Sequence, residues 1–292
     1  KYMIDALFIA PGNAKGIYQS LSEDYSAIET PTWALLLAES CRSVGYNVGI
    51  LDVSAERLTH QEVLNRIIEI SPRFLVFVVY GQNVNAGTTN MSGAVALSSF
   101  IKSNDCPSPI VFVGSHAQAL PIDTLEQESS IDIVCTNEGV YALWNLMKLN
   151  EINPVVLSKV KGIGYRDFDK VQLTEPEVVV PQDRLDIDLP GYAWDLLPYK
   201  ESPFDLYRAP MWHAEYDFDN RTPYAAIQTS LGCQFQCEFC MINIINRSDN
   251  ERIGVAGNYN QMRHWSTDFI INEFDKLIGM GVKTIKIVDE MF

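Results

Sequence analysis

Three cysteines, Cys233, Cys237 and Cys240, lie within an eight-residue segment that directly follows a strand-like run. Three thiolates at this CxxxCxxC spacing can wrap one [4Fe–4S] cluster while its fourth iron keeps no protein ligand. An iron with an open position can bind a substrate or cofactor, whereas a cluster held by four cysteines only passes electrons. The alternative interpretations are a structural zinc site and a simple electron-transfer cluster. Zinc prefers CxxC pairs with a fourth ligand, and the nearest candidate, His264, lies 24 residues beyond Cys240.

The elements that must position this motif begin with an N-terminal α/β pattern. Five short segments within residues 1–150 are rich in Val, Ile and Phe at consecutive positions, which is typical of parallel strands buried on both faces. Helical patterns alternate with them, so we predict an α/β, doubly wound (Rossmann-like) sheet. The expected strands are Met3–Ile9, Asn47–Val53, Arg73–Val79, Ile110–Val113 and Ile131–Cys135.

Helix boundaries can be predicted from capping residues. Thr30 followed by Pro31 predicts an N-cap and a first helical position, and Thr59 with Glu62 predicts a capping box. Further helices are expected at 92–103, 121–128 and 137–149.

The rest of the chain divides into two parts. Residues 151–222 contain seven prolines among acidic and aromatic residues, which predicts an ordered linker with small strands. Residues 223–292 follow the order strand, cysteine loop, helix, strand, with strands at Tyr224–Ser230 and Lys283–Val288 and a helix capped by Ser266. Because this pattern cannot close a core of its own, we expect that it is truncated.

The cysteine loop, with Phe239 just before its last cysteine, resembles the signature of the radical S-adenosylmethionine superfamily. In that superfamily the motif follows the first strand of a partial (β/α)6 TIM-type barrel, a position that Tyr224–Ser230 would occupy. The resemblance implies that the three cysteines hold a [4Fe–4S] cluster and that Phe239 lies against the adenine of S-adenosylmethionine. It also implies that Glu290, or secondly Asp289, contacts the methionyl amine.

The N-terminal half resembles the cobalamin-binding domain that precedes the barrel in one subgroup of these enzymes. The stretches that carry the resemblance are 31–38, 45–52, 113–117 and 131–139. Ligands of such sheets bind beyond the carboxyl ends of the strands, where this chain is rich in Gly, Asn, Gln and Ser. The resemblance implies cobalamin contacts from Gln82, Gly114, Ser115, His116, Glu138 and Gly139. Loop 11–16 contains no histidine, so we expect no protein histidine on cobalt.

The function that these resemblances imply is that of a cobalamin-dependent radical S-adenosylmethionine enzyme. The expected reaction is methyl transfer to an unactivated carbon through a 5′-deoxyadenosyl radical and methylcobalamin. A cyclase or rearrangement enzyme with the same cofactors is one alternative, and a non-enzymatic cobalamin- or redox-sensing Fe–S module is another. The expected partners are a small-molecule substrate and an electron donor such as flavodoxin or ferredoxin.

Composition limits the remaining partners. The chain has 292 residues, and its 22 Lys and Arg against 37 Asp and Glu give a formal charge of −15. We therefore expect neither nucleic acid nor a membrane surface as a partner, because both would repel this charge. No apolar run reaches the ~20 residues of a transmembrane helix, and the first residues lack the basic-then-apolar pattern of a signal peptide. Six cysteines, three of them clustered, predict a cytoplasmic protein rather than a disulfide scaffold.

Overall fold

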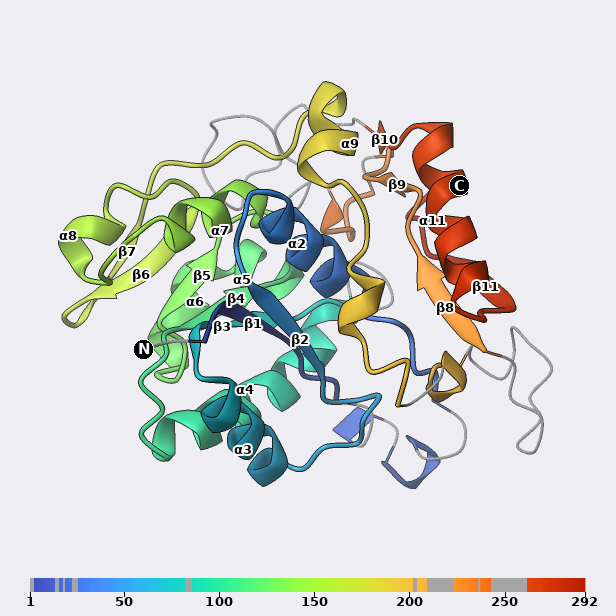
Figure 1. Cartoon of the computed structure of the whole chain (residues 1–292). Coiled ribbons are helices and arrows are strands. Elements are labelled where there is room, and N and C mark those ends of the chain that lie inside the picture. Colours follow the sequence, from blue (N-terminus) through green and yellow to red (C-terminus); the bar gives the residue numbers. More distant parts are fainter. Residues whose placement is uncertain are drawn as a thin grey trace.

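The fold was analysed in a computed structural model of the chain (Figure 1). The structure describes residues 3–291 apart from 14–15, 18, 23–25, 82–85, 202–203, 209–222, 236 and 243–261.

A seven-stranded sheet with the order β2-β1-β3-β4-β5-β6-β7 organises the N-terminal part of the chain. Its first five strands are parallel, and the last two are antiparallel. The predicted doubly wound sheet is thus confirmed, and the chain reverses its direction of winding between β1 and β3, where such sheets bind ligands. The strands are β1 (Ile4–Ala10), β2 (Val48–Asp52), β3 (Pro72–Val78), β4 (Ile110–Val113), β5 (Ile133–Cys135), β6 (Ile163–Asp167) and β7 (Lys170–Leu173).

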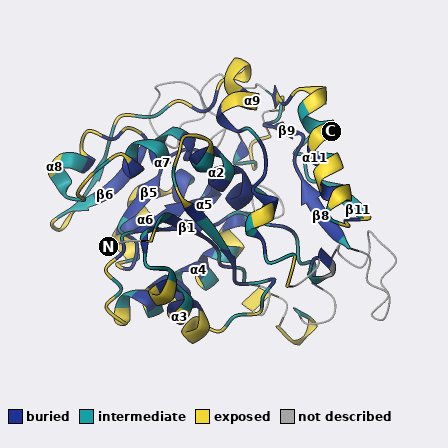
Figure 2. Cartoon of the chain, viewed as in Figure 1, coloured by how far each residue is buried: buried dark blue, intermediate teal, exposed yellow. Residues whose placement is uncertain are grey.

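Helices cover both faces of this sheet because alternate strand residues point to opposite sides. Ala6 and Phe8 of β1 pack into one core with α2 and α7, whereas Leu7 and Ile9 pack into a second core with α3 and α4 (Figure 1). Both cores are fully buried, while the outer sides of the helices are exposed (Figure 2). The helices are α2 (Thr32–Ser43), α3 (His60–Ile70), α4 (Gly87–Ser103), α5 (Ser115–Ala119), α6 (Pro121–Gln127), α7 (Val140–Met147) and α8 (Pro154–Leu157).

The predicted helix caps had different outcomes. The capping box of α3 is confirmed, since the Thr59 hydroxyl accepts from the Glu62 N–H and the Glu62 carboxylate accepts from the Thr59 N–H. The cap predicted at Thr30 is wrong. Pro31 is the N-cap of α2, and the Thr30 hydroxyl is bonded instead to the main chain of Ala226.

The segment after residue 150 contributes to both parts of the structure. Small strands were expected in this segment, and two strands, β6 and β7, lie in it and extend the N-terminal sheet. Beyond them, short helical turns alternate with buried aromatic side chains, and this segment runs between the N-terminal part and β8 (Figure 1, yellow). Trp194 and Tyr192 stack at 4.9 Å within a core shared by the two parts. The turns are α9 (Leu185–Asp188) and 3₁₀ helices at Gln182–Arg184, Trp194–Leu196 and Phe204–Leu206; another 3₁₀ helix, Gln19–Ser22, precedes α2.

The C-terminal part is a strand–helix–strand unit. The parallel strands β8 (Tyr224–Ile227) and β11 (Thr284–Ile287) pair in register, and α11 (Thr267–Gly279) connects back to them. Ser266 caps α11 as predicted, because its hydroxyl accepts from the Phe269 N–H. β9 (Ser230–Leu231) pairs antiparallel with β10 (Arg263–His264) on either side of the cysteine loop. In the described part of the chain β8 and β11 form a two-stranded sheet, and the barrel stays a prediction. No described helix is long and apolar enough to cross a membrane.

Candidate functional site

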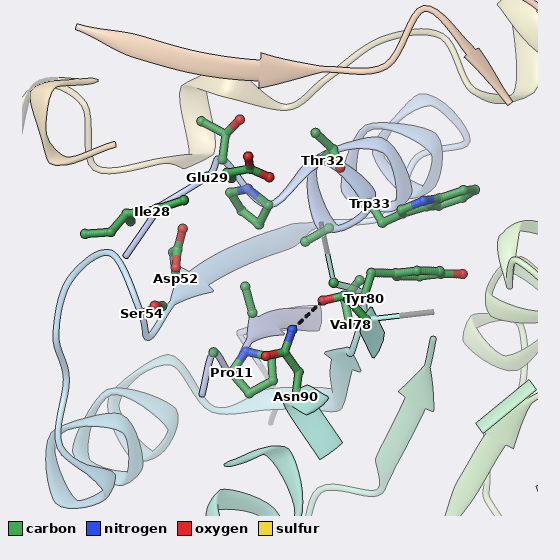
Figure 3. A pocket seen from close by; sticks show the side chains of 18 of the residues that line it. Pro11, Ile28, Glu29, Thr32, Trp33, Asp52, Ser54, Val78, Tyr80 and Asn90 are labelled. Atoms are coloured by element: carbon green, nitrogen blue, oxygen red, sulfur yellow. Dashed lines mark hydrogen bonds between the residues drawn. The ribbon is translucent and has the colours of Figure 1, made fainter. Parts of the chain in front are cut away.

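A cavity of about 400 Å³ lies where the carboxyl ends of β1, β2 and β3 face the ends of β8 and β11 (Figure 3). This volume falls within the ~300–1,000 Å³ range of small-molecule sites. Its polar lining comes from both parts of the chain. The described lining residues with polar side chains are Asn13, Glu29, Thr30, Thr32, Trp33, Asp52, Ser54, Tyr80, Thr89, Asn90, Gln228 and Glu290.

Two aromatic rings form one wall of the cavity. Trp33, in the first turn of α2, stacks on Tyr80 with ring centroids 5.0 Å apart and planes inclined by 17°. The Asn90 side chain donates to the Tyr80 carbonyl oxygen at 2.8 Å, which ties α4 to the end of β3 (Figure 3). The pair is amphipathic and rigid, and it offers a flat apolar surface beside the polar strand ends.

Asp52, at the end of β2, places a carboxyl group in the lining of the cavity. Its side chain accepts from the Ala55 N–H at 3.0 Å and from the Tyr207 hydroxyl at 3.1 Å. Burial of the carboxyl group raises the pKa of Asp52 to about 6 despite these two donors. The residue is 3% exposed and lines the cavity.

The free edge of β8 is covered by two hydroxyl groups. The Thr30 hydroxyl donates to the Ala226 carbonyl at 2.7 Å and accepts from the Ala226 N–H at 2.9 Å. The Tyr192 hydroxyl makes the same pair of bonds with the main chain of Gln228, at 2.8 and 3.1 Å. These bonds satisfy main-chain groups that would otherwise be buried without partners, and they fix β8 against the N-terminal part.

Asp289 connects the end of β11 to the start of the cysteine loop. Its carboxylate accepts from the Thr229 N–H at 2.7 Å, from the Thr229 hydroxyl at 2.5 Å and from the Ser230 hydroxyl at 3.0 Å. Glu290, the next residue, lines the cavity. Of the two carboxylates predicted to contact S-adenosylmethionine, Glu290 therefore faces the cavity and Asp289 holds the strand ends together.

The chemistry of the cysteine loop fits a cationic iron–sulfur cluster. Burial raises the pKa of Cys240, and the Glu290 carboxylate and the neighbouring Cys237 and Cys233 raise it further, because a thiolate here would be desolvated and repelled by other negative groups. A cation bound by the thiolates would relieve this repulsion. The Cys240 N–H donates to the Cys237 carbonyl at 3.0 Å. Among the described residues no three His, Cys, Asp or Glu side chains already surround a common metal position.

Phe239, predicted to lie against adenine, is 81% exposed on this loop. The aromatic face is thus accessible to a ligand.

The five described residues that were predicted to contact cobalamin lie at the ends of β4 and β5, outside the described lining of the cavity. A side chain at Gly114 would overlap the Val79 carbonyl oxygen, so the chain approaches closely there. The Ser115 hydroxyl is buried and has no hydrogen-bond partner in the described part of the chain. His116 lies 3.1 Å from the Thr88 hydroxyl, and burial lowers its pKa. Gln82 lies outside the described residues.

Glu138 and Gly139, the other two residues predicted to contact cobalamin, follow β5 and take part in the protein's own packing. Gly139 begins α7 with a positive φ of 87°, and Glu138 is fully buried. The Glu138 carboxylate accepts from the Val180 N–H at 2.6 Å and pairs with the Arg263 guanidinium at 2.7 Å. The Arg263 guanidinium also donates to the Val180 carbonyl at 2.6 Å. The observed partners of Glu138 are therefore protein groups, and its predicted contact with cobalamin stays a prediction.

Sequence reasoning missed Arg263, Asp52 and Tyr192. Asp52 stands at a strand end within the stretch 45–52, which was a usable signal. The partners of Arg263 and Tyr192 are 125 and 36 residues away in sequence, so no local pattern marks them.

Comparison with known proteins identifies the class of the N-terminal part. Residues 23–146 match the B12 binding domain family. Across 252 residues the chain is 25% identical to an uncharacterized methyltransferase from Pyrococcus horikoshii, covering 85% of the chain and 46% of that protein. It is 23% identical over 211 residues to the anaerobic magnesium-protoporphyrin IX monomethyl ester cyclase of Synechocystis. This match covers 72% of the chain and 37% of that protein.

Solved structures share the fold. The cobalamin-dependent S-adenosylmethionine radical enzyme OxsB matches 99% of this chain and 34% of its own length, with a TM-score of 0.64 and 18% identity. A second match is the radical S-adenosylmethionine methyltransferase TsrM from Kitasatospora setae, solved with cobalamin and a [4Fe–4S] cluster bound. The match covers 99% of this chain and 48% of TsrM, with a TM-score of 0.62 and 14% identity.

Residues 23–146 therefore match a B12-binding domain, and the chain is distantly similar to the two curated relatives and shares the fold of the solved enzymes. It spans less than half the length of the two curated relatives.

Proposed function

We propose that this chain is the cofactor-binding part of a cobalamin-dependent radical S-adenosylmethionine enzyme that methylates an unactivated carbon. The observation that carries the proposal is the cavity between the two parts. One of its walls is made by strand ends of the B12-binding domain, and the other by strand ends that flank a CxxxCxxC loop. A ligand in this cavity would touch the cobalamin side and the cluster side at once.

The residues of the C-terminal part have separate tasks in this proposal. Cys233, Cys237 and Cys240 would hold the [4Fe–4S] cluster, and Phe239 and Glu290 would bind S-adenosylmethionine. When bound, these groups and cobalamin would supply radical chemistry and a methyl donor. Asp289 holds the start of the cysteine loop on β11 through three hydrogen bonds.

The N-terminal part would bind cobalamin at the carboxyl ends of its parallel strands. Gly114 permits close approach of the chain, and the unpartnered Ser115 hydroxyl offers a buried polar group to a ligand. The stacked rings of Trp33 and Tyr80 keep water from one side of the cavity, which protects reactive species. A small-molecule substrate and a reductant such as flavodoxin or ferredoxin complete the proposal.

Cyclisation is the second candidate, and it is favoured by the relationship to the magnesium-protoporphyrin ester cyclase. The two reactions differ in their products, because only a methyltransferase moves a labelled methyl group from S-adenosylmethionine to a substrate.

The test is anaerobic reconstitution of the chain with iron, sulfide and hydroxocobalamin, followed by absorption and electron paramagnetic resonance spectroscopy. We expect one [4Fe–4S] cluster and one cobalamin per chain. Cys237→Ala should lose the cluster and keep cobalamin, whereas Cys106→Ala, which changes a half-buried cysteine remote from the loop in sequence, should keep both. A cluster that persists in Cys237→Ala would show that the ligand assignment is wrong.

A further inference from the structure

The end of β8 carries an amide side chain whose oxygen lacks a donor. Gln228 lines the cavity and is 7% exposed, and its Oε1 atom is buried with no hydrogen-bond partner among the described residues. A buried acceptor without a donor is destabilising, so native proteins rarely retain one unless a ligand or an ion satisfies it. The position of Gln228 therefore indicates a ligand that brings an N–H or O–H group.

The backbone of Gln228 is fixed before any ligand arrives. The fully buried Tyr192 hydroxyl bonds both the N–H and the C=O of Gln228, and Thr30 does the same for Ala226 two residues earlier. Both hydroxyls belong to segments outside the strand–helix–strand unit. The amide side chain thus extends from a main chain that is already anchored, which limits the entropy lost when it binds a ligand.

The charges around the cavity restrict the chemistry of that ligand. Glu29, Asp52 and Glu290 contribute carboxyl groups to the lining, whereas none of the described lining residues is Lys, Arg or His. Glu29 is paired with Lys286, and the other two lie at strand ends on opposite sides of the cavity. Such a lining favours neutral or cationic groups that donate hydrogen bonds, and it disfavours phosphate.

We infer that Gln228 accepts a hydrogen bond from a peripheral amide of the corrin ring, so that the C-terminal part recognises the cofactor of the B12-binding domain. The corrin periphery carries primary amides, which are uncharged and have two N–H donors each. The nucleotide tail of cobalamin carries a phosphate, which this lining would repel. The inference rests on the proposed binding of cobalamin.

The test is a titration of the reconstituted chain with hydroxocobalamin and, separately, with cobinamide, a corrin that lacks the nucleotide tail. Gln228→Met removes the amide at similar side-chain volume. We expect its Kd for both corrins to rise about tenfold, because one hydrogen bond with its desolvation penalty is of this order. The Kd for S-adenosylmethionine should stay within about twofold of wild type.

Gln182→Met is the matched control. The Gln182 side chain bonds the main chain of His264 twice at 2.7 Å, so it also joins the two parts of the chain, but it does not line the cavity. Its corrin affinity should be unchanged, and circular dichroism should confirm that both variants are folded.

Each other outcome contradicts the inference. Unchanged corrin affinity in Gln228→Met would overturn it, and equal weakening in Gln182→Met would trace the effect to looser packing of the two parts. Weakening for hydroxocobalamin alone would assign the contact to the nucleotide tail, and weakening for S-adenosylmethionine alone would assign it to that ligand. A wild-type chain that binds no corrin would overturn the proposed function itself, whereas the preceding outcomes leave that function standing.

Discussion

Asp52 shows how burial at a strand end changes the pH dependence of one carboxyl group. Its pKa is raised from 3.8 to about 6 in the folded chain, chiefly by desolvation. The folded state therefore holds this proton more tightly than the unfolded state. By linkage, the free energy of unfolding is highest at low pH for this group and falls as the pH rises from about 4 to about 6.

Asp52→Asn should remove this dependence. The variant keeps an oxygen for the Ala55 N–H and cannot ionise, so its stability should exceed that of wild type at pH 7 by at most about 3 kcal/mol. The measurement is urea unfolding of both proteins at several pH values between 4 and 7. A difference that does not change with pH would show that Asp52 titrates normally. Asp169→Asn, in the exposed turn between β6 and β7, is the control.

At the scale of elements, one buried ion pair joins β10 to the loop after β5. Arg263 and Glu138 are 3% and 1% exposed, and both bond the main chain of Val180 in a third segment. Removing one member of such a pair leaves a buried charge without a partner. The pair thus holds the base of the cysteine loop against the B12-binding domain, because β10 pairs with β9 directly before Cys233.

Arg263→Met should lower the free energy of unfolding by about 3–5 kcal/mol, and adding Glu138→Gln should recover part of the loss. The comparison is Arg42→Met, whose guanidinium pairs with Asp195 at 2.7 Å near the surface and should contribute less than about 1 kcal/mol. Urea unfolding at constant ionic strength measures the three variants and wild type. Equal losses for Arg263→Met and Arg42→Met would contradict the structural role given to the buried pair.

The elements that the sequence predicts well are those whose signals are local. The five parallel strands follow from consecutive apolar residues, and the caps at Thr59 and Ser266 follow from side chains that bond three residues away. Thr30 was predicted as a cap from the following Pro31 and lacks the Glu that completes the capping box of Thr59, and its hydroxyl bonds a strand 196 residues later. Tertiary contacts therefore replaced the predicted cap, and nothing in the sequence around Thr30 marks this distant partner.

The candidate site was predictable to a similar extent. The cysteine motif follows from spacing along one segment and Glu290 from the family resemblance, whereas the cavity depends on strand ends that only the folded chain brings together. Glu138 shows that a sequence motif can predict the position of a residue but not its partner. It occupies the expected position after β5, but its carboxylate meets an arginine that lies 125 residues away in sequence.

At the scale of the whole molecule, Trp194 connects the two parts. It is 2% exposed, stacks on Tyr192, and donates to the buried Glu273 of α11 at 2.8 Å. The apolar core around it includes residues of the N-terminal sheet, of α11 and of β8. Because this core is continuous, we expect the two parts to unfold in one cooperative transition.

Trp194→Ala should separate that transition into two, because the cavity left by a buried Trp costs about 3–5 kcal/mol at the junction. The amides of α11 should then lose their protection from hydrogen exchange first. Hydrogen exchange measured by mass spectrometry would compare the amides of α11 with those of β3. Trp144→Ala, which alters a half-buried tryptophan of α7, should leave the protection of α11 unchanged. Equal loss of protection in α11 and β3 for Trp194→Ala would contradict a junction role.

The two hydroxyls on the edge of β8 also set the direction in which its sheet can grow. The main-chain groups of Ala226 and Gln228 that face this edge are already bonded to Thr30 and Tyr192. A further strand cannot pair there without displacing both side chains. Any strand that joins this sheet must add along β11, so the sheet can extend as an arc but cannot close into a ring through β8.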